Sequence, residues 1–356
     1  MEKKIGIGII GAGTISNFHV HGYLKDEHAK IVAVCDVVEE KAIEKAKKWG
    51  VSKWYTDSNK LLKDKDIDAI DICLPPAFHA PVAIAAAKAG KHLFVEKPMA
   101  LTLKDCDEMI EAAKSNNVKL MVGHNQLFFL PHNEAKRLIE TEIGRPIVLV
   151  TRLHNGLPVG GWRADPKISG GFLTEACIHR FYVSRYLMGE IKRVSCMISK
   201  TRPELLTEDV VMASMGFENG SFGSLSANSG GTYPLWDDRT EIIGSEGLVV
   251  VNGVEDQIWP GPPFLFYKDG QWKVYCKRKI SDEMREMFGE NADEISLTPN
   301  EIDTDFAKTF SREVQHFVDC IIDNKTPMVS GEEGKRIIQV IQACYESAKK
   351  GTVVHI

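Results

Sequence analysis

The sequence predicts an α/β protein in which an N-terminal doubly wound parallel sheet is followed by an α+β domain with a large, mostly antiparallel sheet. Residues 4–123 alternate strand and helix patterns with few residues between them, as in βαβ units. After His124 the pattern changes to strands joined by Asn-Gly and Asp-Gly turns, which favour hairpins. The length of 356 residues fits two domains at roughly 100–200 residues each.

Each element of the first region has a local signal. Apolar runs such as KIGIGIIG and HLFVE predict buried strands. Gly50 stands where a left-handed residue ends a helix, and Thr102 precedes Asp105 at capping-box spacing. Strands are expected at residues 4–11, 30–36, 54–55, 67–75, 92–96 and 119–124, with helices ending at residue 24, spanning 38–49, 61–63 and 77–90, and starting after residue 102.

The second region mixes helices with hairpins. Asn219-Gly220 and Asp269-Gly270 predict two of the hairpin turns. A domain boundary is therefore expected near residue 124, giving domains 1–124 and 125–356. Helices are expected at residues 131–142, about 171–187, roughly 305–323 and 332–349, with strands at residues 146–154 and between 191 and 276.

Composition excludes several classes of protein. The net charge is −5 and the pI about 6.2, so the basic patches that bind nucleic acid or anionic membranes are not expected. No segment approaches the ~18 apolar residues of a membrane span, and the glycine-containing N-terminal run lacks a signal-peptide cleavage site. The eight cysteines stand singly, which is typical of reduced thiols in a cytoplasmic protein.

The turn after the first strand predicts a dinucleotide site of the Rossmann type. Gly11 and Gly13 permit a tight turn and the close approach of a pyrophosphate, which then rests near Thr14 and Ile15 at the helix N-terminus. Asp36 ends the second strand, at the spacing of a carboxylate that binds ribose hydroxyls. The alternative is a glycine-rich turn with Asp36 as a helix cap.

The residues after Asp36 bear on the choice of cofactor. Val37 and Val38 follow it, with no arginine to meet a 2′-phosphate. The sequence therefore favours NAD over NADP.

Two later strands also end in polar residues. In a doubly wound sheet, ligands bind beyond the carboxyl ends of the strands. The fourth strand ends at Leu74 and Pro75, followed by His79, and the fifth ends at Glu96 and Lys97. We expect these residues to face the cofactor, the alternatives being a capping or solvent-facing His79 and a strand that simply ends in solvent.

Several runs then resemble one family, the glucose–fructose oxidoreductase / myo-inositol dehydrogenase (Gfo/Idh/MocA) family. The resemblance covers almost the whole chain, and the EKP run combined with the later GG-x-L…H helix is specific. The runs are GAGTIS, PPAFH, AGKHLFVEKPMA, GWRADPKISGGFLTEACIHRF, EDVVMASMGFENGSFG, IIGSEG and PMVSGEEGKRIIQVIQACYESAKKG.

The resemblance implies an NAD(P)-dependent dehydrogenase that oxidises a secondary hydroxyl of a sugar, glycoside or cyclitol. Lys97 would hydrogen-bond the reacting oxygen and help to hold or transfer its proton. His179 would be the general base, and Glu175, four residues earlier on the same helical face, would orient it or bind a substrate hydroxyl. The family usually has aspartate at the position of Glu175. An ordinary surface pair is the alternative reading.

The resemblance also suggests further pocket residues. Trp162 and Arg163 resemble family residues near the cofactor and the substrate, although Trp162 could equally pack in a core. Asn125 follows the sixth strand, and Arg152 and His154 end the next strand. We expect Asn125 near the cofactor and Arg152 and His154 near the substrate.

Other functions remain open at this point. One is a glycoside-transforming enzyme that uses NAD catalytically through a transient keto-sugar, and another is a non-catalytic dinucleotide-binding regulator. A metal site is not expected, because Cys177 points away from Glu175 on a helix. The free face of the second sheet predicts a homodimer or homotetramer.

Overall fold

The computed structural model describes the chain except residues 1–3, 155–159, 230–236, 253–263, 276–302 and 304. Its packing divides into two compact units, Met1–Asn125 with Phe310–Ile338, and Gln126–Thr309 with Gln339–Ile356. The sequence had assigned everything after residue 124 to the second domain. Phe310–Ile338 belongs with the first unit because the Phe18 and Phe310 rings lie 4.7 Å apart and Gly22 leaves no room for a Cβ beside Val314.

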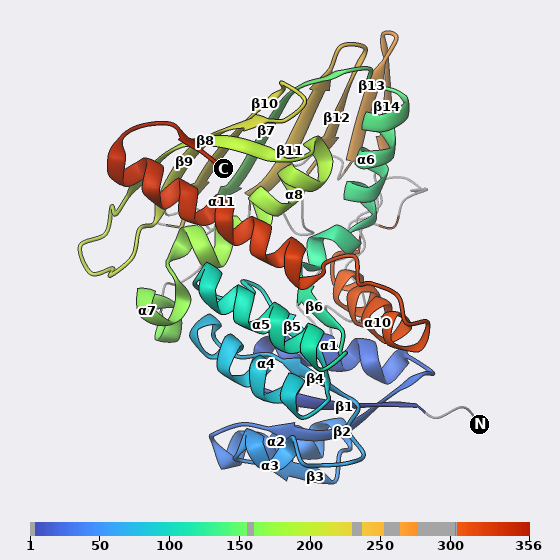
Figure 1. Ribbon diagram of the computed structural model, residues 1–356. Coiled ribbons are helices and arrows are strands. Elements are labelled where there is room, and N and C mark those ends of the chain that lie inside the picture. Colours follow the sequence, from blue (N-terminus) through green and yellow to red (C-terminus); the bar gives the residue numbers. More distant parts are fainter. Residues whose placement is uncertain (1–3, 155–159, 230–236, 253–263, 276–302, 304) are drawn as a thin grey trace. The chain divides into compact units, whose positions relative to one another are not determined.

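The first unit contains a six-stranded sheet in the order β3-β2-β1-β4-β5-β6 (Figure 1). Every neighbouring pair is parallel, which confirms the predicted doubly wound sheet. The strand order reverses between β1 and β4, and this switch point is where such sheets bind dinucleotides. The strands are β1 (Ile5–Ile10), β2 (Ala29–Cys35), β3 (Lys53–Tyr55), β4 (Ala69–Ile72), β5 (His92–Glu96) and β6 (Leu120–Gly123).

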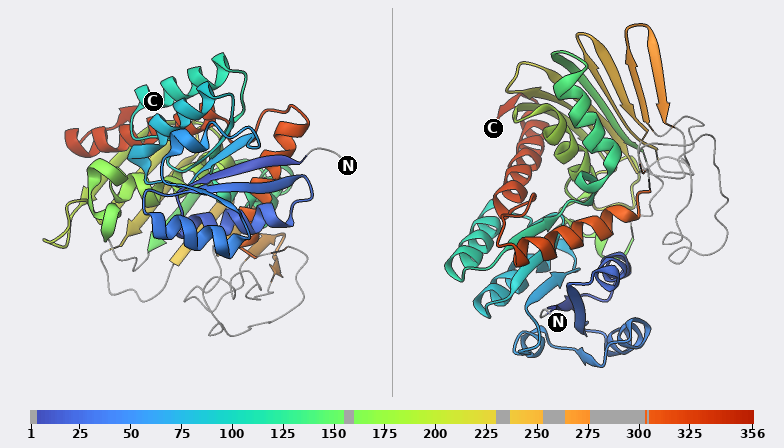
Figure 2. Two further views of the ribbon diagram at one scale, coloured as in Figure 1. Left: turned by 90° about the horizontal axis from the view of Figure 1, so that it is seen from below. Right: turned by 90° about the vertical axis from the view of Figure 1, so that its right-hand side faces the viewer.

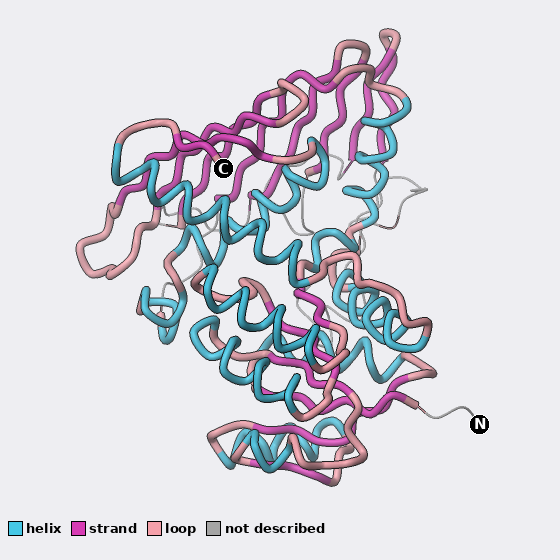
Figure 3. Tube along the Cα trace, viewed as in Figure 1, coloured by secondary structure: helices cyan, strands magenta, loops and turns pink. Residues whose placement is uncertain are grey.

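Helices flank this sheet (Figure 3). The expected caps are present: Gly50 is left-handed at φ 68°, and Thr102 accepts a hydrogen bond from the Asp105 N–H at 3.1 Å. Among the described residues, no helix has both the length and the apolar character that a membrane span requires. The helices are α1 (Thr14–Lys25), α2 (Glu39–Trp49), α3 (Ser58–Leu61), α4 (His79–Lys88), α5 (Leu103–Ser115) and α10 (Lys308–Ile322).

The second unit contains a nine-stranded sheet in the order β14-β13-β12-β11-β7-β10-β9-β8-β15. Only the β7–β10 pair is parallel among the pairs described, so the predicted mostly antiparallel sheet is confirmed. The strands are β7 (Pro146–His154), β8 (Ile191–Ser199), β9 (Val210–Phe217), β10 (Phe222–Asn228), β11 (Asp237–Gly244), β12 (Gly247–Val251), β13 (Phe264–Lys268), β14 (Gln271–Tyr275) and β15 (Val354–His355).

One face of this sheet is covered by helices. The helices α6 and α8 lie along the same side of it (Figure 2), and the side chains of β7 alternate accordingly between buried and exposed positions. We call the other side, which carries Val150, Met212 and Phe222, the open face. The helices of this unit are α6 (Leu130–Thr141), α7 (Pro166–Ser169), α8 (Ile178–Met188) and the end of α11 (Gly331–Lys350).

The helix predicted from about residue 171 to 187 is not uniform. Leu173–Cys177 forms a π-helical turn before α8 begins. Glu175 therefore lies in a widened turn, a feature that is frequent at functional sites.

Candidate active site

The glycine turn after β1 fits a pyrophosphate. Gly11 has φ +102°, and a Cβ there would lie 2.3 Å from the Cys73 carbonyl oxygen, so this position requires glycine. A Cβ on Gly13 would meet no protein atom within 4 Å, which leaves open space at the N-terminus of α1. Ser16, at a position where a third glycine is common, donates a hydrogen bond to the Gly13 carbonyl at 2.8 Å. The open space beside Gly13 thus lies at the N-terminus of α1, where a helix attracts an anion.

Asp36 lies directly after β2, at the same edge of the sheet. Its two carboxylate oxygens accept the N–H groups of Ala12 and Val38, each at 2.9 Å. Asp36 therefore ties the glycine turn to the end of β2, and each oxygen keeps a lone pair for a ribose hydroxyl. The capping role and the ribose role are compatible here. The exposed Val37 offers no cation to a 2′-phosphate.

Replacement of Asp36 by alanine is expected to raise the Kd for NAD by about tenfold or more, since a hydrogen bond to a charged group contributes ~1.5–3 kcal/mol. The Kd for NADP is expected to change less, because its 2′-phosphate cannot use the carboxylate. Titration calorimetry with both cofactors measures the two effects. Asp36→Asn, which keeps one carbonyl acceptor, is the matched control, and equal losses for both cofactors would contradict a ribose contact.

His79 is enclosed by main-chain carbonyl groups. Its side chain is fully buried, with Nδ1 2.8 Å from the Pro98 carbonyl oxygen and Nε2 2.7 Å from that of Leu74. Burial lowers the pKa of the imidazole. His79 therefore connects the loop after β4 to the turn after β5 through its two ring nitrogens, whereas Leu74 and Pro75 remain partly exposed.

Lys97 leaves the carboxyl end of β5 in a turn closed by a cis Lys97–Pro98 peptide bond. The ammonium-bearing side chain is half-buried, while the preceding Glu96 is buried and accepts the Lys97 main-chain N–H at 3.0 Å. Burial, with a smaller contribution from the Lys97 charge, lowers the pKa of the neighbouring His124 to about 3. A neutral histidine thus accompanies the lysine, and Asn125 beside it is also buried.

In the second unit, Arg163 joins two of the predicted residues. Its guanidinium lies 4.3 Å from the centre of the Trp162 ring, and its Nε lies 3.2 Å from Glu175 Oε1. Trp162 is therefore a partly exposed stacking partner of a cation and not a core residue. His179 follows one turn later, on α8, and is half-buried.

The π-helical turn that carries Glu175 is held at its start. Glu208 accepts the Leu173 N–H at 2.8 Å and the Tyr345 hydroxyl at 2.7 Å. Gly171, at φ +94°, leaves room for these two groups, because a Cβ there would lie within 2.7 Å of both. Gly171 therefore serves the packing of the turn itself, and Gly170 is the left-handed residue, at φ 81°, that ends α7.

Arg152 and His154 lie on the open face. Arg180 of α8 reaches Thr240 at 3.5 Å, and Thr240 pairs with Thr151 of β7, so α8 covers the face that carries Thr151. Arg152 and His154 alternate to the other face, where they contact Asp237, Ser226 and Asn228. Their predicted role as substrate ligands stays a prediction, and the contacts described for them are with neighbouring strands of the sheet.

The sequence reading missed three buried ionisable residues of the first unit. His19, Asp71 and Glu313 are completely buried, and Asp71 and Glu313 approach the His19 ring. The sequence showed such residues only as polar positions inside otherwise apolar segments, such as the aspartate in AIDI. Their partners are remote in the sequence.

Two family models match the chain. The first is described as an oxidoreductase family with an NAD-binding Rossmann fold and matches residues 5–124. The second is described as the C-terminal alpha/beta domain of an oxidoreductase family and matches residues 136–356.

Individual proteins are similar over most of the chain. A myo-inositol 2-dehydrogenase of Thermotoga maritima is 32% identical over 256 residues, covering 70% of this chain and 76% of the relative. A scyllo-inositol 2-dehydrogenase (NAD+) of Bacillus subtilis is 28% identical over 365 residues, covering 100% and 97%. A levoglucosan dehydrogenase structure in complex with NADH and levoglucosan has a TM-score of 0.84 at 25% identity, covering 99% of this chain and 100% of that one.

Proposed function

We infer the function from the premise that this chain belongs to the Gfo/Idh/MocA family of oxidoreductases, as both of its matched domains show. It is an NAD-binding oxidoreductase. We propose that it oxidises, reversibly, a secondary ring hydroxyl of a cyclitol, sugar or glycoside. The names of the inositol and levoglucosan dehydrogenases that it resembles support this substrate class.

The first unit is proposed to hold the cofactor. Gly11, Gly13, Thr14 and Ile15 would bind the pyrophosphate, and Asp36 the ribose. The nicotinamide supplies the hydride acceptor or donor. The observation that carries the proposal is the position of Lys97. This residue follows β5 at the carboxyl edge of the sheet, where β1 also ends in the glycine turn. Doubly wound sheets bind their ligands at this edge.

Lys97 is proposed to hydrogen-bond the reacting oxygen and to hold or pass on its proton. In the second unit, His179 is proposed as the base that takes the hydroxyl proton. Glu175, paired with Arg163, is proposed to bind a neighbouring substrate hydroxyl. With glutamate in place of the usual aspartate, the carboxylate reaches one methylene further, which would select a differently placed hydroxyl.

An absorbance screen at the NADH band tests this function. The purified chain is incubated with NAD and, separately, with NADP, together with cyclitols, aldoses, anhydrosugars and glycosides. The expected result is substrate-dependent NADH formation with at least one ring polyol. Consumption of a glycoside without net NADH would favour the enzyme that uses NAD catalytically. NAD binding without any turnover across the screen would favour a regulator and overturn the proposal.

The open face supports a proposed homo-oligomer. Its exposed apolar side chains lie on neighbouring strands, since Val148 pairs with Phe222 and Ile243, and Met212 pairs with Met197. Covering them with a second copy would remove apolar surface from water. Light scattering measures the mass in solution.

The seven free cysteines of the described residues are all buried, which supports the proposed cytoplasmic location.

A further inference from the structure

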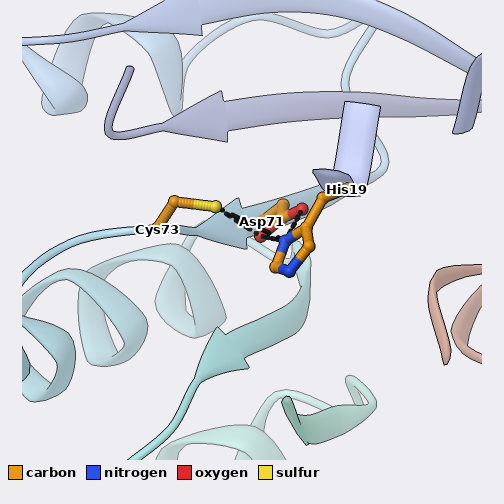
Figure 4. Close-up of side chains that lie close together, drawn as sticks. All are labelled: His19, Asp71 and Cys73. Carbon is orange, nitrogen blue, oxygen red and sulfur yellow. Dashed lines mark hydrogen bonds and ion pairs between the residues drawn. The ribbon is translucent and has the colours of Figure 1, made fainter. Parts of the chain in front are cut away.

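A cluster of five buried ionisable side chains lies in the first unit, and the roles proposed above leave most of it unexplained. We call it the His19 cluster. Figure 4 shows the His19 ring beside Asp71 and Cys73. The cluster consists of His19 of α1, Asp71 of β4, Cys73, which directly follows β4, Glu96 of β5 and Glu313 of α10.

Both ring nitrogens of His19 face carboxylates. Nδ1 lies 3.0 Å and 3.2 Å from the two Asp71 oxygens, and Nε2 lies 3.1 Å from Glu96 Oε1. The rings of Phe94 and Phe310 lie 5.1 Å and 6.0 Å from that of His19, so the surroundings are apolar. Nδ1 is hydrogen-bonded to Asp71, whereas Nε2 and Glu96 form an ion-pair contact, and a carboxylate on each side favours a positively charged ring.

Glu96 connects this histidine to the turn after β5. Its Oε1 faces His19, and its Oε2 accepts the Lys97 main-chain N–H at 3.0 Å. Gly123, the neighbour of Glu96 on β6, leaves space for the carboxylate, since a Cβ there would lie 3.3 Å from Oε1. The Glu96 carboxylate is therefore held between His19 and the main chain of Lys97.

We propose that His19 is a positioning residue for hydride transfer: it holds the Glu96 carboxylate, which in turn fixes the main chain from which the Lys97 side chain leaves β5. The inference rests on the proposed role of Lys97. His19 is completely buried and acts through Glu96. A reacting group needs such support, because a misplacement of about 1 Å can cost about 100-fold in rate.

The charges within the cluster agree with this arrangement. Burial alone would lower the pKa of His19, but Asp71 and, less strongly, Cys73 raise it, so that it stands well above the ordinary value. Burial raises the pKa of Glu313 well above its ordinary value. The charge of His19 lowers this pKa, and the charges of Glu96 and Asp71 raise it further. These directions favour a charged His19 facing Asp71 and Glu96, and a Glu313 that binds a proton more readily than an ordinary glutamate. Tyr23, whose pKa is raised by burial and by Asp71, stays neutral.

The charge of His19 predicts how the free energy of unfolding depends on pH. The pKa of His19 is higher in the folded chain than its unfolded value of about 6.5. The stabilisation from its charge is therefore complete below that value and is lost as the pH rises through the folded pKa. The stability difference between the wild type and His19→Gln is expected to be largest near pH 6 and to shrink at alkaline pH. A difference that does not depend on pH would contradict a charged His19.

Nitrogen NMR of histidine-labelled full-length protein tests the charge state without any substrate. The His19 signal is assigned by its absence in His19→Gln. Two protonated ring nitrogens are expected at pH 7.5, and a neutral imidazole there would overturn the proposal. This measurement on the wild type decides the question even if the variant fails to fold.

A double-mutant cycle tests the connection to Lys97. His19→Gln and Glu96→Gln are each expected to lower kcat about 10- to 100-fold, with the KM for NAD within about twofold of wild type. If His19 acts through Glu96, His19→Gln adds little in the Glu96→Gln background. Independent, multiplying effects on kcat would overturn the proposal. His28→Gln, at an exposed histidine of the same unit, is the matched control.

Hydrogen exchange of the Lys97 amide gives a readout that does not need activity. In His19→Gln this amide is expected to exchange up to about tenfold faster, as its hydrogen bond to Glu96 loosens. Unchanged exchange would overturn the proposal, whereas a wild type without turnover would overturn only the proposed function. Finding one divalent metal per chain in the purified protein would also overturn the positioning role of His19, because His19 Nε2, Glu96 and Glu313 would then be metal ligands.

Discussion

A Lys97→Met variant is expected to bind NAD normally and to lose about 10²- to 10⁴-fold in kcat, the range typical of a lost proton-transfer group. Methionine keeps most of the side-chain volume but removes the ammonium that would bind the reacting oxygen. The main-chain contact from Lys97 to Glu96 does not involve the side chain, so the turn should persist. Stopped-flow absorbance of NADH formation, together with the Kd for NAD, measures both quantities.

Two further variants sharpen this test. Lys97→Arg keeps a positive charge but gives up a proton far less readily than an ammonium group, so only partial activity is expected. Lys104→Met is the matched control, since Lys104 is an exposed lysine of α5 in the same unit. Turnover by Lys97→Met within about threefold of wild type would remove Lys97 from the mechanism.

A second large effect is expected on stability, at the buried ion pair between Arg180 of α8 and Asp238 of β11. Both side chains are 1% exposed. Removing one partner of a buried pair costs ~3–5 kcal/mol, because the other charge loses its counterion in an apolar environment. Arg180→Met is therefore expected to lower the free energy of unfolding by about that amount, measured by urea denaturation.

The double variant Arg180→Met with Asp238→Leu separates charge from packing. Replacing both ions with apolar groups of similar volume is expected to recover most of the lost stability. The matched control is Arg137→Met on α6, where the same substitution breaks an ion pair with Glu134. The Arg137 side chain is 53% exposed, and an exposed ion pair contributes ~0–1 kcal/mol to stability. Equal losses for Arg180→Met and Arg137→Met would contradict the special position of the buried pair.

The arrangement of the proposed cofactor residues at one edge of the sheet could be predicted from the sequence to a large extent. The Gly11 turn, Asp36 and Lys97 each end a strand of a parallel sheet, and all such ends meet at one edge. A local pattern together with the fold class was therefore enough to place these residues at that edge. His79 was the exception: its position beside the loop was predictable, but its burial between two carbonyl groups was not.

The strand β7 shows why the substrate half was harder to predict. Its sequence PIVLVTRLH has apolar residues on both faces, since the open face is itself apolar. The alternation that normally distinguishes inside from outside is therefore weak, and the sequence did not show on which face of the sheet Arg152 and His154 lie. The π-helical turn at Glu175 was equally invisible, because it depends on contacts from Glu208 and Tyr345.

By itself, then, the sequence determined the two sheets, the glycine turn after β1 and the position of Lys97 at the end of β5, because each depends on residues close together in the chain. Only the tertiary structure decided the grouping of Phe310–Ile338 with the first unit and the meeting of His19, Asp71, Glu96 and Glu313. These residues come from four separate elements. Their charge states and contacts exist only once packing excludes water from the space between them.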